Sequence, residues 1–211
     1  MKNLLLDLIY PPKCIFCRQV LAPGHEKLCP ACAGKYTGMD LERTGKHFRR
    51  CVTPMRYDGA VREAVLRYKF QGRDCYAPEL GRILAGAIRE KLVYDLITWV
   101  PVSRERRRER GYDQAQLLAE AAAEALGETA EATLEKVRHN PAQSGMDGEK
   151  ARRGNVKGVY RALDPERIKG KRVLLIDDII TTGATMDEAA GTLIAAGAAE
   201  VAAAALAQPV S

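Results

Sequence analysis

One stretch decides the fold of this 211-residue chain: Val173-Leu-Leu-Ile-Asp-Asp-Ile-Ile-Thr-Thr-Gly-Ala-Thr185. Its leading run of aliphatic residues is typical of a strand that is buried on both faces of a parallel sheet. A turn of small residues follows, and residues 186–196 have helical composition. A strand, a Gly/Thr turn and a helix place free backbone N–H groups and the positive end of the helix dipole where a phosphate can bind. The stretch therefore predicts a phosphate site at the carboxyl edge of an open α/β sheet.

Two adjacent carboxylates, Asp177 and Asp178, stand at the end of this predicted strand. Carboxylates beside an anion site repel a bare phosphate, so hydroxyl groups or a divalent cation have to lie between them. A ribose 5-phosphate has this shape, with a diol at one end and a phosphate at the other. The chain has neither a G-x-x-x-x-G-K-[ST] motif nor a G-x-G-x-x-G motif, which disfavours a P-loop or a dinucleotide fold. A structural strand end capped by Asp and Thr is the alternative.

A second predicted strand, residues 95–100, is followed by an arginine cluster. Five arginines occur within the seven residues 104–110, and they open a predicted helix that runs to about Leu126. The planar guanidinium fork binds phosphate oxygens in pairs, so the cluster fits a polyanion such as pyrophosphate, although a solvated helix start is the alternative. The residues that we assign to this role are Arg104, Arg106, Arg107 and Arg110.

The remaining segments complete an alternation of strands and helices. Residues 53–59 resemble an edge strand and turn, and helices are expected at 61–70 and 76–92. The alanine-rich segment 198–207 favours helix by propensity, but its place in the alternation predicts a buried strand. Residues 134–161 lack sustained apolar periodicity, so we expect a long loop with a flexible lid at about 138–156 that excludes water from the site.

Four of the six cysteines form two C-x-x-C pairs, Cys14/Cys17 and Cys29/Cys32. Two such pairs complete a tetrahedral sulfur shell for a structural Zn²⁺. Disulfides are rare in a reducing compartment, and neither pair has the strand–helix context of a thioredoxin-like redox site. Residues 11–50 have few large apolar side chains, so the metal would supply their folding energy. Cys51 and Cys75 are interpreted as plain thiols.

Charge and hydropathy limit the class of protein further. No apolar stretch approaches the ~20 residues that cross a bilayer, and Asp7 interrupts the apolar start. We therefore expect a short amphipathic helix at 1–10, no membrane insertion and a cytoplasmic location. The net charge is +6, and residues 1–51 carry nine Lys/Arg against four Asp/Glu. This excess favours phosphate-bearing partners. Interleaved aromatic side chains could stack on the bases of a nucleic acid, although a small-core role is the alternative; they are Phe16, Tyr36 and Phe48.

Residues 173–185 resemble the phosphoribosyl-pyrophosphate (PRPP) signature of type I phosphoribosyltransferases. The resemblance implies a type I phosphoribosyltransferase-like parallel sheet flanked by helices, with Asp177 and Asp178 on the ribose hydroxyls. It also implies Mg²⁺ between ribose and pyrophosphate oxygens. The PRPP-binding residues that it implies in the loop are Ile179, Thr181, Thr182, Gly183, Ala184 and Thr185.

Over about residues 8–208 the sequence resembles the ComF family of bacterial competence-associated phosphoribosyltransferase-like proteins. The resemblance rests on the four-cysteine front end, on Tyr57-Asp-Gly, on Tyr68-Lys-Phe-Gln-Gly72, on Arg110-Gly-Tyr-Asp-Gln114, on Gln143 and Arg153-Gly-Asn-Val156, and on the PRPP signature. It adds Lys69 to the expected PRPP-binding residues. The sequence departs from the family pattern at Cys51, where many members carry a further C-x-x-C pair.

The resemblance divides the chain into a zinc-ribbon-like module, residues 1–50, and a phosphoribosyltransferase-like domain, residues 51–211. It implies one of two functions. The first is Mg²⁺-dependent phosphoribosyl transfer from PRPP to an acceptor that the sequence does not identify, in association with competence and DNA uptake. The second is a non-catalytic factor for natural transformation that binds single-stranded DNA, with a regulatory or vestigial PRPP pocket. A competence helicase is the expected protein partner.

Overall fold

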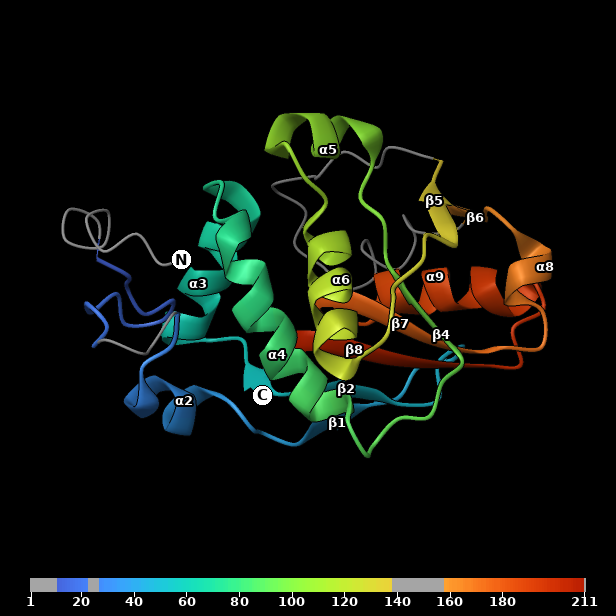
Figure 1. Ribbon diagram of the computed structural model, residues 1–211. Helices are drawn as coiled ribbons and strands as arrows, with labels where there is room; N and C mark the ends of the chain where they lie inside the picture. Colours follow the sequence, from blue (N-terminus) through green and yellow to red (C-terminus); the bar gives the residue numbers. More distant parts are fainter. Residues whose placement is uncertain (1–10, 23–26, 138–157, 211) are drawn as a thin grey trace.

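The computed structural model describes residues 11–22, 27–137 and 158–210 (Figure 1). The strands are β1 (Leu41–Arg43), β2 (Cys51–Thr53), β3 (Met55–Arg56), β4 (Leu96–Trp99), β5 (Leu134–Lys136), β6 (Tyr160–Ala162), β7 (Arg172–Ile179) and β8 (Glu200–Gln208). The helices are α2 (Pro30–Tyr36), α3 (Gly59–Phe70), the 3₁₀ helix η1 (Asp74–Tyr76), α4 (Ala77–Ile88), α5 (Arg104–Arg110), α6 (Gln114–Leu126), α8 (Pro165–Ile168) and α9 (Ala184–Ala195). The expected helix at 1–10 and the expected lid at 138–156 lie outside the described residues.

The central sheet has the strand order β1-β2-β8-β7-β4, and β3 pairs with β8 beyond the end of β2. All its neighbours are parallel except β1, which runs antiparallel to β2. The predicted α/β class with a mostly parallel sheet is confirmed. Strand β1 precedes the predicted domain boundary and β2 follows it, so the sheet includes residues on both sides of position 50.

Strands β7 and β8 form the middle of the sheet because both of their faces are covered. Val173, Leu174, Leu175 and Ile176 are completely buried, as the aliphatic run predicts. Strand β8 is buried from its second residue to its last, so the predicted strand at 198–207 is confirmed against the helix propensity of alanine. Small side chains suit this position, because a central strand meets covering helices on both sides.

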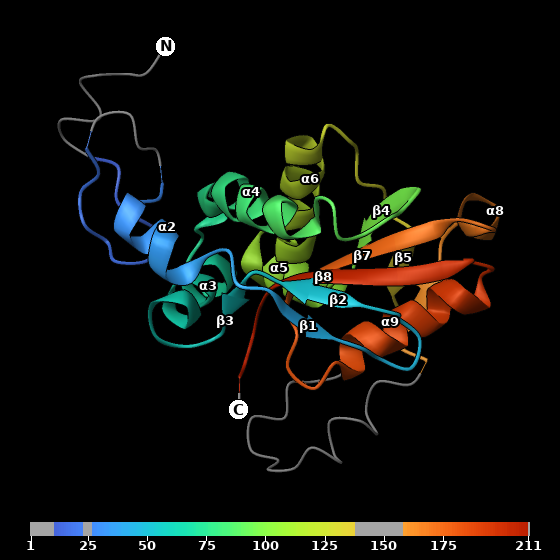
Figure 2. The same cartoon turned by 90° about the horizontal axis from the view of Figure 1, so that it is seen from below.

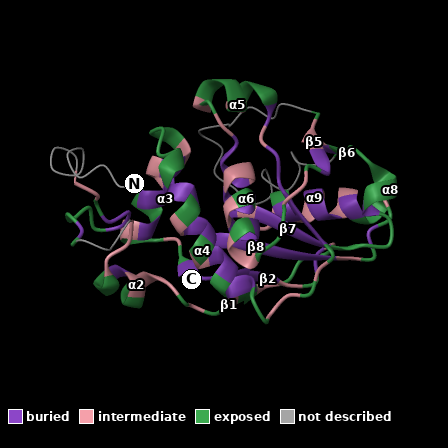
Figure 3. Ribbon diagram, viewed as in Figure 1, coloured by how far each residue is buried: buried purple, intermediate pink, exposed green. Residues whose placement is uncertain are grey.

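Helices cover the sheet in two layers (Figures 1 and 2). One core lies between the sheet and the layer of α3, α4 and α6, and it includes Leu174 and Ile176. The other core lies on the α9 side and includes Val173 and Leu175. Successive strand residues point to opposite faces, which assigns alternate residues of β7 to the two cores. Figure 3 shows β7 and β8 buried, whereas α5 has no buried residue.

The prediction of one helix from residue 104 to Leu126 is wrong. Helix α5 ends at Gly111, which has φ +83° in the left-handed region, and α6 begins after Asp113. The Asp113 carboxylate accepts the backbone N–H groups of Ala115 and Gln116. A left-handed glycine after one helix and a capping aspartate before the next define two helices separated by a turn.

The cysteine-bearing segment packs directly on this domain. Its residues Ile15, Phe16 and Leu21 belong to the same core as side chains of α3 and α4. The Arg67 guanidinium on α3 also donates to the carbonyl of Ile15 at 2.7 Å. A segment with few apolar residues therefore gains much of its burial from α3.

Close packing of α4 on α6 gives the first testable prediction. A Cβ atom at Gly81 would lie 2.5 Å from Ala121 Cβ and 2.6 Å from its backbone carbon, whereas a Cβ at Gly86 on the same helix would meet nothing within 4 Å. Gly81→Ala should lower the free energy of unfolding in urea by about 1–3 kcal/mol, because two helix backbones would have to separate.

Gly86→Ala is the matched control. It should leave the protein equally stable or more stable by up to about 1 kcal/mol, since alanine is the better helix former. Equal stability of the two variants would contradict the predicted close approach.

Candidate functional site

The four cysteines of the two C-x-x-C pairs converge. Their Sγ atoms all lie within 4.8 Å of one another, and those of Cys17 and Cys29 are 3.9 Å apart. A tetrahedral site with zinc–sulfur bonds of ~2.3 Å separates its sulfurs by about 3.8 Å. All four are free thiols. The donor set and its spacing fit a structural zinc ion with four sulfur ligands and no open position, as the sequence predicts.

The backbone around Cys14 favours the thiolate form that zinc binds, whereas the pKa values of the Cys17 and Cys32 thiols are raised. Burial of Cys14 raises the pKa of its thiol, but the backbone N–H groups of Cys29, Cys17 and Phe16 outweigh this and lower the pKa to about 7. Cys29 caps α2, where its sulfur accepts the N–H of Cys32 at 3.4 Å. Cys51 is buried in the sheet and Cys75 is exposed, and neither joins the cluster.

The predicted phosphate loop lies between β7 and α9. Gly183 is the N-cap of α9 with φ +80°, and no side chain caps this helix. Within the described part of the chain, the backbone N–H groups of Thr181, Thr182 and Gly183 donate to no protein acceptor. Ala184 N–H makes one 3.3 Å contact with the Thr182 hydroxyl. These amides are available to an anion, and they lie at the positive end of the α9 dipole.

Asp178 is held at the end of β7 by a lysine from α3. Its side chain is 5% exposed, and its Oδ1 lies 2.8 Å from Lys69 Nζ. Burial lowers the pKa of Lys69, but the Asp178 carboxylate more than compensates and raises it. The second carboxylate oxygen, Oδ2, is buried and has no hydrogen-bond partner in the residues that the structure describes. A buried acceptor without a donor is costly, which makes this oxygen a candidate contact for a ligand.

Asp177 belongs to the other face of the sheet. Its Oδ1 accepts the backbone N–H of Asp178 at 2.8 Å. Burial and the adjacent Asp178 carboxylate raise the pKa of Asp177 well above its ordinary value, and Lys69 offsets only part of this. The pair therefore presents one carboxylate with a lysine partner and one whose pKa a nearby cation or hydrogen-bond donor would lower.

Two of the predicted arginines join Lys69 in one pocket. Arg106 and Arg110 are one helical turn apart on α5, and with Lys69, Phe70, Gly72 and Glu109 they line a pocket of about 720 Å³. Burial lowers the pKa of Arg110, partly offset by Asp178. Arg104 points elsewhere, 3.8 Å from Glu135, and Arg107 is exposed. Ile179 is half-buried against the core, and Thr185 is exposed at the start of α9.

Hydrogen bonds between α3 and the α5–α6 turn hold this pocket together. The Tyr68 hydroxyl donates to the carbonyl of Gln114 at 2.8 Å, and the Tyr112 hydroxyl donates to the carbonyl of Tyr68. Asp113 accepts the N–H of Val102, which follows β4. The motifs at 68–72 and 110–114 therefore have a structural role: they fix Lys69 and Arg110 relative to β7.

Three further residues near the site were not predicted from the sequence. Lys136, on β5, has its pKa lowered by burial and by Arg106, while Asp177 acts in the opposite direction. Arg43, on β1, donates to the carbonyl of Thr181 in the phosphate loop. His47 Nδ1 lies 3.0 Å from Asp187 Oδ2. Each reaches the site from a segment that is distant in the sequence, and no local sequence pattern indicates this position.

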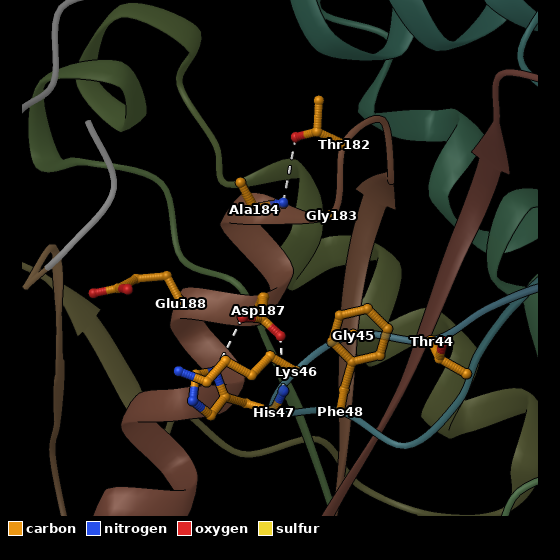
Figure 4. Close-up of a pocket in the computed structure, with 10 residues that line it drawn as sticks. All are labelled: Thr44, Gly45, Lys46, His47, Phe48, Thr182, Gly183, Ala184, Asp187 and Glu188. Atoms are coloured by element: carbon orange, nitrogen blue, oxygen red, sulfur yellow. Dashed lines mark hydrogen bonds and ion pairs between the residues drawn. The ribbon is translucent and has the colours of Figure 1, made fainter. Parts of the chain in front are cut away.

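His47 and Asp187 line a second pocket, of about 410 Å³, on the outer side of the loop (Figure 4). The Asp187 carboxylate also accepts the backbone N–H of His47 at 2.7 Å. Gly191 allows the His47 ring to lie on α9, because a Cβ there would come within 3.1 Å of Nδ1. The segment between β1 and β2 is thereby clamped to the first turns of α9.

Comparison with known proteins identifies both parts of the chain. Residues 113–210 match the phosphoribosyl transferase domain family, and residues 5–64 match the double zinc ribbon domain family. The chain therefore combines a phosphoribosyltransferase-type domain with a zinc ribbon.

Its relatives include competence protein F of Haemophilus influenzae, with 28% identity over 90% of this chain and 93% of the relative. DNA utilization protein YhgH of Escherichia coli is 27% identical over 92% and 96%, and competence protein ComFC of Bacillus subtilis is 26% identical over 87% and 78%. The chain is a homologue of these competence and DNA utilization proteins, which confirms the resemblance to the ComF family.

Solved structures with a similar arrangement include the glutamine PRPP amidotransferase from B. subtilis and the allosteric regulatory enzyme of purine biosynthesis. Both are 25% identical to this chain and match 66% of it, with TM-scores of 0.47 and 0.46. The match spans less than a third of either enzyme, 30% and 29% of their chains. Among the described residues, no helix is both long and apolar enough to cross a bilayer.

The zinc site gives the second prediction. Cys29→Ser should reduce bound zinc, measured by elemental analysis, from one ion per chain to well below one. It should also lower the melting temperature by several degrees, because zinc binding is folding energy for such a small module. Cys75→Ser, at an exposed thiol outside the cluster, is the control and should change neither quantity. Full zinc content in the Cys29 variant would contradict the assignment.

The Lys69–Asp178 pair gives the third prediction. Lys69→Met should lower the free energy of unfolding by about 3–5 kcal/mol, because it leaves a buried carboxylate unpaired. The double variant Lys69→Met/Asp178→Asn should recover most of this loss in the same urea titration, since no uncompensated charge remains. A double variant as unstable as the single one would show that the lysine acts through packing rather than through its charge.

Proposed function

We propose that the domain binds PRPP with Mg²⁺ and transfers its phosphoribosyl group to an acceptor that has yet to be identified. The observation that carries this proposal is the buried Oδ2 of Asp178, which has no hydrogen-bond partner among the described residues. Asp178 shortly precedes the loop with open amides, and its Oδ1 contacts Lys69, which lines the pocket with three cationic side chains. A sugar that carries a phosphate at each end, with hydroxyl donors between them, matches this order of groups.

Each part of the proposed ligand has a counterpart in the chain. The 5-phosphate would accept the N–H groups of residues 181–183 at the start of α9, and the ribose hydroxyls would donate to Asp177 and Asp178. Lys69, Arg106 and Arg110 would bind the pyrophosphate and stabilise the negative charge that it gains as the bond to ribose breaks. Catalysis would then rest on positioning and charge stabilisation, without a nucleophilic side chain.

The carboxylate pair also fits a magnesium ion. Mg²⁺ is commonly held by one or two carboxylates together with substrate phosphates. When bound with PRPP, it would neutralise charge on the pyrophosphate oxygens. The raised pKa of Asp177 is consistent with this arrangement, because a nearby divalent cation favours the ionised carboxylate that burial disfavours. The lid at 138–156, the domain boundary at residue 50 and a cytoplasmic location remain parts of this proposal.

Calorimetric titration with PRPP tests the ligand. Binding should require Mg²⁺ and should fall at least tenfold in Asp177→Asn/Asp178→Asn, since the loss of one charge-assisted hydrogen bond alone costs about 1.5–3 kcal/mol. Asp164→Asn, at the N-cap of α8, is a control of the same chemistry. Release of pyrophosphate with candidate acceptors then tests turnover. Unchanged affinity in the double variant would refute this position for the ribose.

A second function, binding of single-stranded DNA, is supported by the names of the relatives and by the excess of basic residues in 1–51. In this alternative the PRPP pocket is regulatory or vestigial, and a competence helicase is the protein partner.

The affinity for a labelled oligothymidylate should fall steeply between 50 and 200 mM salt, because several phosphates release their counterions when lysine and arginine bind them. Fluorescence anisotropy measures this dependence, and an affinity that is independent of salt would contradict direct binding of the strand.

A further inference from the structure

The pocket between the end of α3 and α5 contains an aromatic side chain that the proposed PRPP site does not use. Phe70, the last residue of α3, is 61% exposed, although it is a large apolar residue. Every other phenylalanine, tyrosine or tryptophan in the described residues is buried or half-buried. Phe70 lines the same pocket as Lys69, Arg106 and Arg110. Among the described residues, its ring is therefore the one largely exposed aromatic surface that this pocket offers to a ligand.

The ring is held in place by a cation. The Arg110 guanidinium carbon lies 4.7 Å from the centre of the Phe70 ring. Arg110 is itself fixed by a 2.8 Å hydrogen bond to Gln114 Oε1 on α6. A guanidinium on an aromatic ring is a favourable pair, and it leaves Phe70 ordered but still largely open to solvent. The pocket therefore presents a fixed aromatic surface beside positively charged side chains.

We propose that this pocket binds an unpaired base of a single-stranded nucleic acid, with the base stacked on Phe70 and the adjoining phosphate on Arg106. Stacking on an aromatic side chain next to a cationic groove is how proteins hold single strands without reading their sequence. The carboxylate of Glu109 also lines this pocket, so its positive side is formed by Lys69, Arg106 and Arg110. The inference rests on the second proposed function and adds to it a location, the end of α3.

The location of the stacking site overlaps the pocket proposed for the pyrophosphate of PRPP. Arg106 would bind both the pyrophosphate of PRPP and a phosphate of the strand, so the two ligands would compete for this side chain. Binding of PRPP and of a strand at this pocket would therefore be competitive.

The test compares Phe70→Leu, which keeps apolar bulk but removes the ring, with Phe70→Tyr, which keeps the ring. The probe is a fluorescently labelled ten-residue oligothymidylate, measured by anisotropy without PRPP. Phe70→Leu should weaken binding about tenfold, within the range expected for the loss of one stacked base, and Phe70→Tyr should bind within about twofold of the unsubstituted protein. Val93→Ala, at an exposed apolar residue outside the pocket, should have no effect.

An abasic oligomer with the same number of phosphates isolates the role of the base. It should bind the unsubstituted protein about as weakly as the thymidylate binds Phe70→Leu, and Phe70→Leu should not weaken it further. Excess thymidine monophosphate should compete poorly; full competition would identify a free nucleotide as the ligand and overturn the assignment to a strand. Unlabelled PRPP with Mg²⁺ should displace the oligomer.

The outcomes separate this inference from the proposed functions. If the protein binds the oligomer and Phe70→Leu does not weaken binding, the strand lies elsewhere and the inference is wrong, while the second function stands. If no oligomer binds under any salt condition, both fail. If the oligomer binds through Phe70 but PRPP neither binds nor competes, the first function fails and the stacking site remains.

Discussion

The ion pair between Lys69 and Asp178 connects the parts of the molecule on which the site depends. Asp178 stands at the carboxyl end of β7, directly before the phosphate loop, and Lys69 lies at the end of α3. One carboxylate oxygen of Asp178 contacts Lys69, while the other has no hydrogen-bond donor among the residues that the structure describes. The pair therefore orients a buried acceptor at the end of β7. A carboxylate at the surface would have neither property, because solvent would hydrate both of its oxygens.

Helix α3 links the Lys69–Asp178 ion pair to the cysteine-bearing segment. The helix that presents Lys69 also packs against Ile15 and Phe16, and its Arg67 donates to the carbonyl of Ile15. The zinc site thus supports the outer face of a helix whose last turn reaches the carboxylate pair. A small metal module that folded independently would not need to share a hydrophobic core with this helix. The cysteine-bearing segment and the ion pair therefore both contact the same helix.

Much of this arrangement can be predicted from the sequence. The features that cannot be predicted depend on tertiary contacts between distant segments. The aliphatic side chains of residues 173–176 are all buried when they form a strand that is covered on both faces. Two C-x-x-C pairs can bring their four sulfur atoms together around one metal ion. The break between α5 and α6 was missed, although Gly111 followed by Asp113 is a recognisable stop and start. That only Arg106 and Arg110 of the predicted arginines face Lys69 follows from helical spacing, but which face meets α3 is decided by tertiary packing. Lys136 and Arg43 reach the site from distant strands, so no local pattern indicates them.

The order of chemical groups along the sheet edge narrows the class of ligand more than any single residue does. Amides and a helix dipole alone would suit any small anion, and a cationic pocket alone would suit any polyphosphate. Between them stand two carboxylates, which would repel both kinds of ligand if nothing separated the charges. A molecule with neutral donors in its middle and anionic groups at both ends would match all three zones at once. Burial, together with the adjacent Asp178 carboxylate, raises the pKa of Asp177, and a cation or hydrogen-bond donor beside the pair would lower it.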